Sequence, residues 1–140
     1  MAEVFLDTGY LLALERRTDD NHHKALDHWR SRKREGLPRL ICTTYVFDEC
    51  ITYLASRGLH ASAVKVGHRL MESGSVELVH VSKDLFYRGF ELFESRPDKR
   101  YSMTDCISFC VMRDRGITSA FAFDEHFSQE GFDRHPRPID

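Results

Sequence analysis

The sequence lacks several features that would place it in common protein classes. It contains no apolar stretch approaching the roughly 18 residues that are needed to cross a bilayer. Residues 1–5 show no basic segment followed by a long apolar one, so we expect no secretory signal and a cytoplasmic protein. The glycine-rich motifs GxxxxGK and GxGxxG are absent, which argues against nucleotide-cofactor chemistry. Without a repeat, linker or low-complexity tract, the 140 residues suit a single domain spanning 1–140.

Cysteine is also scarce, and its spacing excludes two common kinds of site. None of the four cysteines forms a Cys-x-x-Cys pair, so a zinc ribbon or a thioredoxin-like motif is not supported. We predict small buried thiols in a reducing compartment. The residues concerned are Cys42, Cys50, Cys106 and Cys110.

Positive charge is not in excess, because the formal net charge is −2. The protein therefore does not hold nucleic acid through an overall basic surface. Two local basic clusters are candidates for phosphate contacts, one over 30–34 and one formed by Arg96, Lys99 and Arg100. The alternative is a solvated helix face for the first cluster and a charged loop for the second.

Strand and helix patterns alternate along the chain. We predict strands over 4–7, 40–43, 76–81 and 119–123. We predict helices over 9–16, 21–34, 45–56, 60–72, 83–95 and 104–116, with Thr8 and Thr44 as caps of the first and third. The tail from Gly131 is either a last short strand or irregular. This alternation is typical of an α/β domain with a parallel central sheet.

Four carboxylates lie where predicted strands end or helices begin. Asp7 and Asp124 each close an apolar run, Asp105 opens a helix, and Glu49 lies near the edge of a helical apolar stripe. A carboxylate directly after a buried strand is costly to desolvate unless something binds it. In parallel sheets ligands bind beyond the carboxyl ends of the strands. Acids gathered there suit a hard divalent cation, Mg²⁺ or Mn²⁺.

The acidic segments carry a family resemblance. Residues 6–10 (LDTGY), 101–105 (YSMTD) and 123–127 (FDEHF) resemble three motifs of the PIN domain, and Glu49 stands where that family places its second acid. The resemblance covers nearly the whole chain and is strongest to small stand-alone PIN ribonucleases, including VapC-type toxins. It implies a three-layer domain in which helices flank a central parallel sheet of four to five strands. The implied strand order is 3-2-1-4, with a possible fifth strand at the edge.

The resemblance also implies a metal-dependent endoribonuclease that cleaves single-stranded or loop RNA. As the toxin of a type II toxin–antitoxin pair, it would have an antitoxin protein as partner. A divalent ion can activate water and clamp a phosphate, but Mg²⁺ takes few carboxylates directly. We therefore predict Asp7 and Asp105 as inner ligands and Asp124 as a further ligand, while Glu49 orients the water or acts as general base.

Hydroxyl groups flank these acids. By resemblance, Thr8, Ser102 and Thr104 support the pocket through hydrogen bonds, although helix capping is an equal alternative for Thr104. Ala122 departs from the family, which often has Thr or Ser two residues before its fourth acid. This departure removes one possible hydroxyl near Asp124. We interpret His126 as a surface residue in preference to a phosphate contact.

Other functions fit the sequence less well. A phosphoacceptor receiver domain needs an early acidic pair, which is missing. A non-catalytic RNA-binding or scaffold domain of the same fold would be marked by lost acids, yet all four are present. The histidines at 22, 23 and 28 lack the three- or four-residue spacing of a helical zinc site, so we predict that they are solvated.

The apolar residues also suggest self-association. We expect a homodimer, common in similar domains, through exposed apolar side chains. The candidates for this surface are Tyr10, Leu11, Tyr53 and Phe86.

Overall fold

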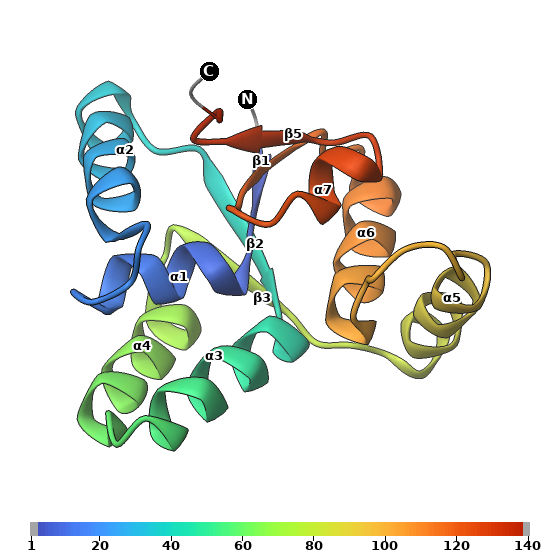
Figure 1. Ribbon diagram of the computed structural model, residues 1–140, viewed down its shortest axis with the longest axis horizontal. Coiled ribbons are helices and arrows are strands. Elements are labelled where there is room, and N and C mark those ends of the chain that lie inside the picture. The colour runs from blue at the N-terminus through green and yellow to red at the C-terminus, as the bar shows by residue number, and fades with distance from the viewer. Residues whose placement is uncertain (1–2, 139–140) are drawn as a thin grey trace.

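Five parallel strands form one sheet in the order β3-β2-β1-β4-β5 (Figure 1). This computed structural model describes residues 3–138, so positions 1–2 and 139–140 of the predicted domain lie outside it. The strands are β1 (Glu3–Leu6), β2 (Arg39–Thr43), β3 (Val76–Val79), β4 (Ser119–Phe121) and β5 (Asp133–His135). The predicted strand order is confirmed, and the fifth strand extends the sheet beyond β4.

Helices cover both faces of this sheet, which confirms the predicted three layers. Figure 1 shows α1 to α4 on one side and α5 to α7 on the other. Their bounds are α1 (Thr8–Glu15), α2 (His22–Glu35), α3 (Thr44–Ser56), α4 (His60–Glu72), α5 (Lys83–Glu94), α6 (Met103–Arg115) and α7 (His126–Gln129). The short helix α7 was not predicted, because four residues are too few to show helical periodicity.

The core fills both faces of the central strands. Val4, Phe5 and Leu6 of β1 are at most 2% exposed, as expected for a parallel strand covered on two sides. The ring of Phe5 lies 6.2 Å from that of Phe127 on the α7 side. On the α1 side, the ring of Tyr10 lies 5.2 Å from that of Phe121. These contacts pack α7 against β1 and α1 against β4.

Strands β1 and β2 pass into their helices almost without a loop. The N-cap positions are therefore Asp7 and Thr43, one residue earlier than we predicted. Thr43 Oγ1 accepts the Val46 N–H at 3.1 Å, whereas Thr44 Oγ1 accepts the Val81 N–H at 3.1 Å and ties down the chain after β3. Asp7 consequently sits at the junction between the sheet and α1.

Two surface predictions are wrong because α2 packs over α1. Tyr10 is fully buried, and its hydroxyl lies 2.7 Å from His28 Nδ1. Burial, with smaller effects of His135 and Arg32, lowers the pKa of His28 to about 4, so this ring is neutral. His22 is half-buried, and its Nδ1 lies 2.7 Å from the carbonyl oxygen of Ala13, whereas His23 is exposed as predicted.

The prediction of buried thiols is confirmed for three of the four cysteines. Cys42, Cys50 and Cys106 are fully buried and free, and burial raises the pKa of each to about 12. They are therefore protonated at neutral pH and act as small apolar side chains. Within residues 3–138, none of the helices is both long and apolar enough to pass through a bilayer.

Candidate active site

The carboxyl ends of β1 and β4 border a cavity of about 370 Å³ together with the starts of α1 and α6 and the middle of α3. All four predicted acids border this one cavity, although they are up to 117 positions apart in sequence (124 − 7). The lining residues are Asp7, Thr8, Gly9, Leu12, Glu49, Tyr53, Arg100, Ser102, Asp105, Asp124 and His126.

Asp7 is the most deeply buried of these acids. Its side chain follows β1 directly, and its backbone N–H donates to the carbonyl of Phe121 at 3.1 Å. Burial raises the pKa of Asp7 to about 8, and the neighbouring charge of Asp105 adds to the effect. Among residues 3–138 no lysine or arginine pairs with this carboxylate. A cation bound in the cavity would supply the missing positive charge.

Asp105 is oriented by a capping box at the start of α6. Ser102 Oγ accepts the Asp105 N–H at 3.0 Å, and Asp105 Oδ2 accepts the Ser102 N–H at 3.0 Å. The two reciprocal bonds satisfy amides that a helix start leaves open. Ser102 thus caps the helix and at the same time fixes the direction of the Asp105 carboxylate.

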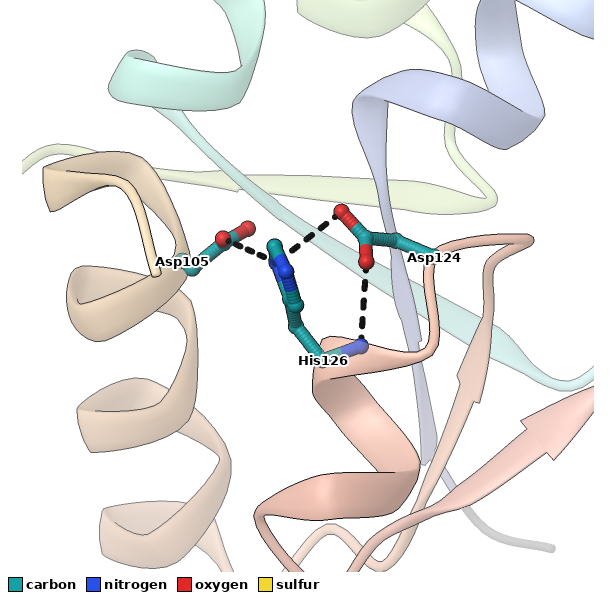
Figure 2. A group of neighbouring side chains, drawn as sticks. All are labelled: Asp105, Asp124 and His126. Carbon is teal, nitrogen blue, oxygen red and sulfur yellow. Dashed lines mark hydrogen bonds and ion pairs between the residues drawn. The ribbon is translucent and has the colours of Figure 1, made fainter. Parts of the chain in front are cut away.

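Asp124 and His126 form a compact unit in the turn between β4 and α7 (Figure 2). Asp124 Oδ1 accepts the backbone N–H of His126 at 3.0 Å. The imidazole Nδ1 lies 3.1 Å from Asp124 Oδ2 and 2.9 Å from Asp105 Oδ2. Ligand atoms of the three residues all lie within 4.8 Å of one another. Our preferred interpretation of His126 as a surface residue is therefore wrong.

A local signal for His126 was present in the sequence. An aspartate two residues before another residue commonly accepts that residue's backbone N–H in a turn. The spacing Asp124-x-His126 after a strand therefore indicates a turn that returns the histidine to its aspartate. What the sequence does not show is that Asp105 lies against the same ring.

The other predicted residues differ in exposure and in whether they line the cavity. Glu49 is exposed in the second turn of α3 and borders the cavity. Thr8 also borders it, and its buried Oγ1 has no hydrogen-bond partner in the part of the chain described. Thr104 is half-buried and does not line the cavity, while its carbonyl accepts the Ser108 hydroxyl at 2.8 Å.

Comparison with known proteins identifies the family. The PIN domain family profile matches residues 4–132. The chain belongs to the PIN domain family. It is 34% identical over 129 residues to the 23S rRNA-specific endonuclease VapC20 from two strains of Mycobacterium tuberculosis, covering 92% of this chain and 95% of the relative. The crystal structure of M. tuberculosis VapC20, described as a Sarcin-Ricin loop cleaving toxin, superposes with a TM-score of 0.83 at 33% identity, over 92% of this chain and 95% of that one.

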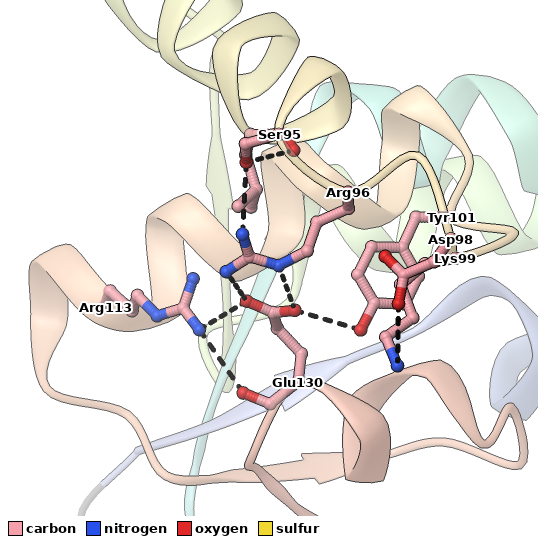
Figure 3. A network of polar contacts seen from close by, with 8 residues as sticks. Ser95, Arg96, Asp98, Lys99, Tyr101, Arg113 and Glu130 are labelled. Carbon is pink, nitrogen blue, oxygen red and sulfur yellow. Dashed lines mark hydrogen bonds and ion pairs between the residues drawn. The ribbon is translucent and has the colours of Figure 1, made fainter.

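In this PIN domain a buried carboxylate holds the region next to the acids together (Figure 3). The Glu130 side chain is 4% exposed and accepts bonds from Arg96 at 3.0 Å, Arg113 at 2.6 Å and the Tyr101 hydroxyl at 2.9 Å. Burial alone would raise the pKa of Glu130, but these three bonds outweigh it and lower the pKa. The Tyr101 ring in turn lies 5.3 Å from the ring of His126.

This Glu130 network was not found from the sequence, and it divides the second predicted basic cluster. Arg96 is held by Glu130, and Lys99 Nζ lies 3.8 Å from Asp98. Arg100 is exposed, borders the cavity and pairs with no carboxylate within residues 3–138. It is the member of this cluster that is free to meet a phosphate.

A second cavity of about 330 Å³ lies between α1, α2 and α4 of the PIN domain. Most of its lining is apolar, and its charged members are Glu15 and Arg69. These two lie 3.8 Å apart at their closest charged atoms. Nothing in this lining suggests a catalytic role.

Proposed function

We propose that this PIN domain is a divalent-metal-dependent endoribonuclease that cleaves single-stranded or loop RNA. The observation that carries the proposal is the convergence of four carboxylates from separate segments on one cavity. Asp7 and Asp105 are 5% and 7% exposed, so their charges need a cation more than surface acids would. The similarity to VapC20, named as a 23S rRNA-specific endonuclease, supports the same chemistry.

The site residues fit Mg²⁺ or Mn²⁺, because carboxylate oxygens are the ligands that both ions accept. Such an ion, when bound, activates a water and offsets charge on the scissile phosphate. Asp7, Asp105 and Asp124 would hold it. Glu49, on the exposed side of the cavity, takes a proton from the attacking water as general base. Ser102 keeps Asp105 in position through the capping box.

Arg100 is the residue that we assign to the RNA backbone. A cavity lined by four acids repels phosphate, so the substrate needs a cation at its edge as well as the bound metal. Arg100 is unpaired among the described residues and supplies that charge. The Sarcin-Ricin loop named for VapC20 makes a loop RNA the substrate to test first.

We assign the protein to the toxins of type II toxin–antitoxin pairs, acting in the cytoplasm. Its antitoxin would cover the acids and block RNA entry.

Self-association would use α5, since Phe86, Tyr87, Phe90 and Phe93 on that helix are 40–55% exposed. This surface keeps Phe86 from the set that we first predicted and omits Tyr10, which lies in the core.

RNA cleavage in vitro tests the enzymatic proposal. A sarcin–ricin stem-loop RNA and total RNA are incubated with the protein and Mg²⁺ or Mn²⁺. We expect cleavage by the wild type and none in EDTA. The cleavage rate of Asp105→Asn should be lower than that of the wild type by a factor of about 100 or more. The matched control is Asp27→Asn, which changes an exposed acid on α2 and should cleave like the wild type. Unchanged cleavage by Asp105→Asn would contradict the assignment.

The alternative function gives a different result in the same experiment. A non-catalytic RNA-binding or scaffold domain would retain the RNA in a gel-shift assay and cleave it under none of the metal conditions.

The toxin assignment is tested in growing bacteria. Expression of the wild type should arrest growth, expression of Asp105→Asn should not, and the product of a short adjacent reading frame should restore growth.

A further inference from the structure

We propose that His126 is a nitrogen ligand of the metal site and makes that site favour transition ions such as Mn²⁺ over Mg²⁺. The proposal rests on the proposed function, because it concerns the ion which that function requires. It adds to the carboxylates a donor of a different chemical kind. It also names a residue outside the set of four acids that we predicted from the sequence.

The spacing of the donor atoms supports this assignment. His126 Nδ1 lies 2.9 Å from Asp105 Oδ2 and 3.1 Å from Asp124 Oδ2. Neighbouring ligands of an octahedral ion with bonds of about 2.1 Å are separated by about 3.0 Å. One imidazole nitrogen can place only one hydrogen between these two carboxylates, whereas Asp105, Asp124 and His126 could each offer one donor atom to a shared ion (Figure 2).

The imidazole is held in one orientation before any ion arrives. Its backbone N–H is bound by Asp124 Oδ1 at 3.0 Å, so the residue that shares the site also fixes the histidine main chain. The ring packs at 63° against the ring of Tyr101, whose hydroxyl is anchored on Glu130. Histidine ligands are typically oriented by such supporting contacts. His22 and His28, by comparison, are turned toward Ala13 and Tyr10.

A second, independent observation points to a ligand in the same cavity. Thr8 Oγ1 is buried on the cavity wall and has no partner within the described residues. A buried hydroxyl without a partner is unusual in a native protein and calls for an unseen one. A water carried by a bound ion supplies such a partner, since Mg²⁺ and Mn²⁺ keep part of their hydration shell.

The chemistry of the nitrogen donor gives the direction of selectivity. Mg²⁺ binds oxygen ligands almost exclusively, whereas imidazole nitrogen is a good ligand for first-row transition ions. A site of carboxylates alone therefore suits both Mg²⁺ and Mn²⁺. Replacing one oxygen by Nδ1 strengthens binding of the transition ion relative to Mg²⁺.

A simpler role for His126 is that of a hydrogen-bond donor between two carboxylates, and the variant His126→Asn separates the two roles. The asparagine amide can place an N–H close to the position of Nδ1, so it preserves a donor to the carboxylates. Its nitrogen has no lone pair for a cation, and only its oxygen can bind one. The matched control is His23→Asn, which changes an exposed histidine on α2.

The experiment uses Mn²⁺ itself as the probe, in the full-length protein without RNA. Pulsed electron paramagnetic resonance should detect nitrogen hyperfine coupling to bound Mn²⁺ in the wild type and in His23→Asn. His126→Asn should lose it. Competition between Mn²⁺ and Mg²⁺ should show that the preference for Mn²⁺ falls about tenfold or more in His126→Asn. Metal affinity falls by about this factor even when only a residue that supports a metal ligand is replaced.

The possible results separate this proposal from the proposed function. If wild-type protein binds Mn²⁺ without nitrogen coupling, while Asp105→Asn weakens that binding, the role of His126 is refuted and the carboxylate site stands. If the wild type binds neither ion at millimolar concentration, both proposals fail. Because the coupling is measured in the wild type, the test does not depend on whether a variant folds.

Discussion

Tyr101 donates a hydrogen bond to Glu130 across 2.9 Å, and this bond joins the loop after α5 to the end of α7. The other end of α7 begins with His126, two residues after Asp124. The Glu130 network therefore fixes the short helix that carries part of the acidic site. Glu130 does not line the cavity, but it ends the helix whose first residue, His126, does.

Replacing Glu130 by glutamine should destabilise the protein and lower cleavage. The amide cannot balance the charges of Arg96 and Arg113. Arg113 lies 2.6 Å from Glu130 Oε2, and this contact would lose its negative charge in the variant. We expect a loss of about 2 kcal/mol in the free energy of unfolding, measured by urea titration, because Glu130 is buried. Glu125→Gln, an exposed change at the N-cap of the same short helix, should leave stability within about 0.5 kcal/mol.

The same network has a defined pH dependence. The folded pKa of Glu130 is lowered, so its contribution to stability is present above its unfolded pKa and is lost as pH falls through the folded value. The stability difference between the wild type and Glu130→Gln should therefore shrink in acid. A difference that is constant from neutral pH to about pH 3 would contradict this account.

Asp7→Asn should make the protein more stable in EDTA and remove a pH dependence. The folded pKa of Asp7 is raised from 3.8 to about 8, so the native state holds a proton that the unfolded chain releases within this window. The free energy of unfolding of the wild type therefore falls as pH rises from about 4 to 8. We expect the melting temperature of Asp7→Asn to exceed that of the wild type by about 5 °C near pH 7, and the two to converge near pH 4.

Metal provides the control for the Asp7 experiment. Added Mn²⁺ binds the ionised carboxylate, so it should raise the melting temperature of the wild type and have little effect on Asp7→Asn. The stabilisation should increase with pH, because protons and the cation compete for the same group. An equal metal effect on both proteins would exclude Asp7 as a ligand.

Arg100→Ala should weaken RNA binding through the loss of one phosphate contact. Both proteins also carry Asp105→Asn, which prevents cleavage. Their affinity for a loop RNA is measured by fluorescence anisotropy, and Arg100→Ala should lower it several-fold at low salt. The slope of log affinity against log salt should decrease by about 0.7 to 1. Arg30→Ala, an exposed change in the first basic cluster, is the matched comparison. If Arg100→Ala leaves the slope unchanged while Arg30→Ala lowers it, the RNA backbone contacts the first basic cluster and not Arg100.

A charge placed on α5 should separate the predicted dimer. Phe90 is 50% exposed at the centre of the aromatic surface, and aspartate there would have to be desolvated in an apolar interface. Light scattering during size-exclusion chromatography should give twice the chain mass for the wild type and the single mass for Phe90→Asp. Met71→Asp, at a 56% exposed site on α4, should remain dimeric. A monomeric wild type would end the dimer prediction.

Gly89→Ala should destabilise the contact between α5 and α6. An added Cβ would lie 2.5 Å from Ile107 Cδ1 and 3.1 Å from Ile107 Cγ1, and Ile107 is fully buried and cannot move aside without disturbing the core. We expect a loss of about 1–3 kcal/mol in the free energy of unfolding. Gly74→Ala meets no atom within 4 Å and should be neutral. If Gly89→Ala and Gly74→Ala are equally stable, Ile107 on α6 makes room for the added methyl group at no cost in stability.

The order of elements and the acidic positions could be predicted because they depend on local patterns. The run Val4-Phe5-Leu6 is apolar throughout since β1 is covered on both faces, and Asp7 interrupts that run where the strand ends. The helix starts were predicted one residue late because β1 and β2 enter their helices directly. Thr43, interpreted as the end of a strand, is also the cap of α3.

The features that were missed depend on contacts between distant segments. Asp105 and His126 are 21 residues apart, and only the packing of α7 beside α6 brings the ring to the carboxylate. Glu130 binds Arg96 across 34 residues and has no local pattern around it. Tyr10 was expected at the surface because its burial depends on α2, which arrives later in the chain.

The distribution of the acids along the chain has a consequence for biosynthesis. The first carboxylate of the cavity is residue 7, whereas Asp124 and His126 are synthesised more than a hundred residues later. A nascent polypeptide cannot assemble the cavity until these two residues have emerged and β4 has paired with β1. A chain that stops before Asp124 would therefore lack two of the residues that line the acidic cavity.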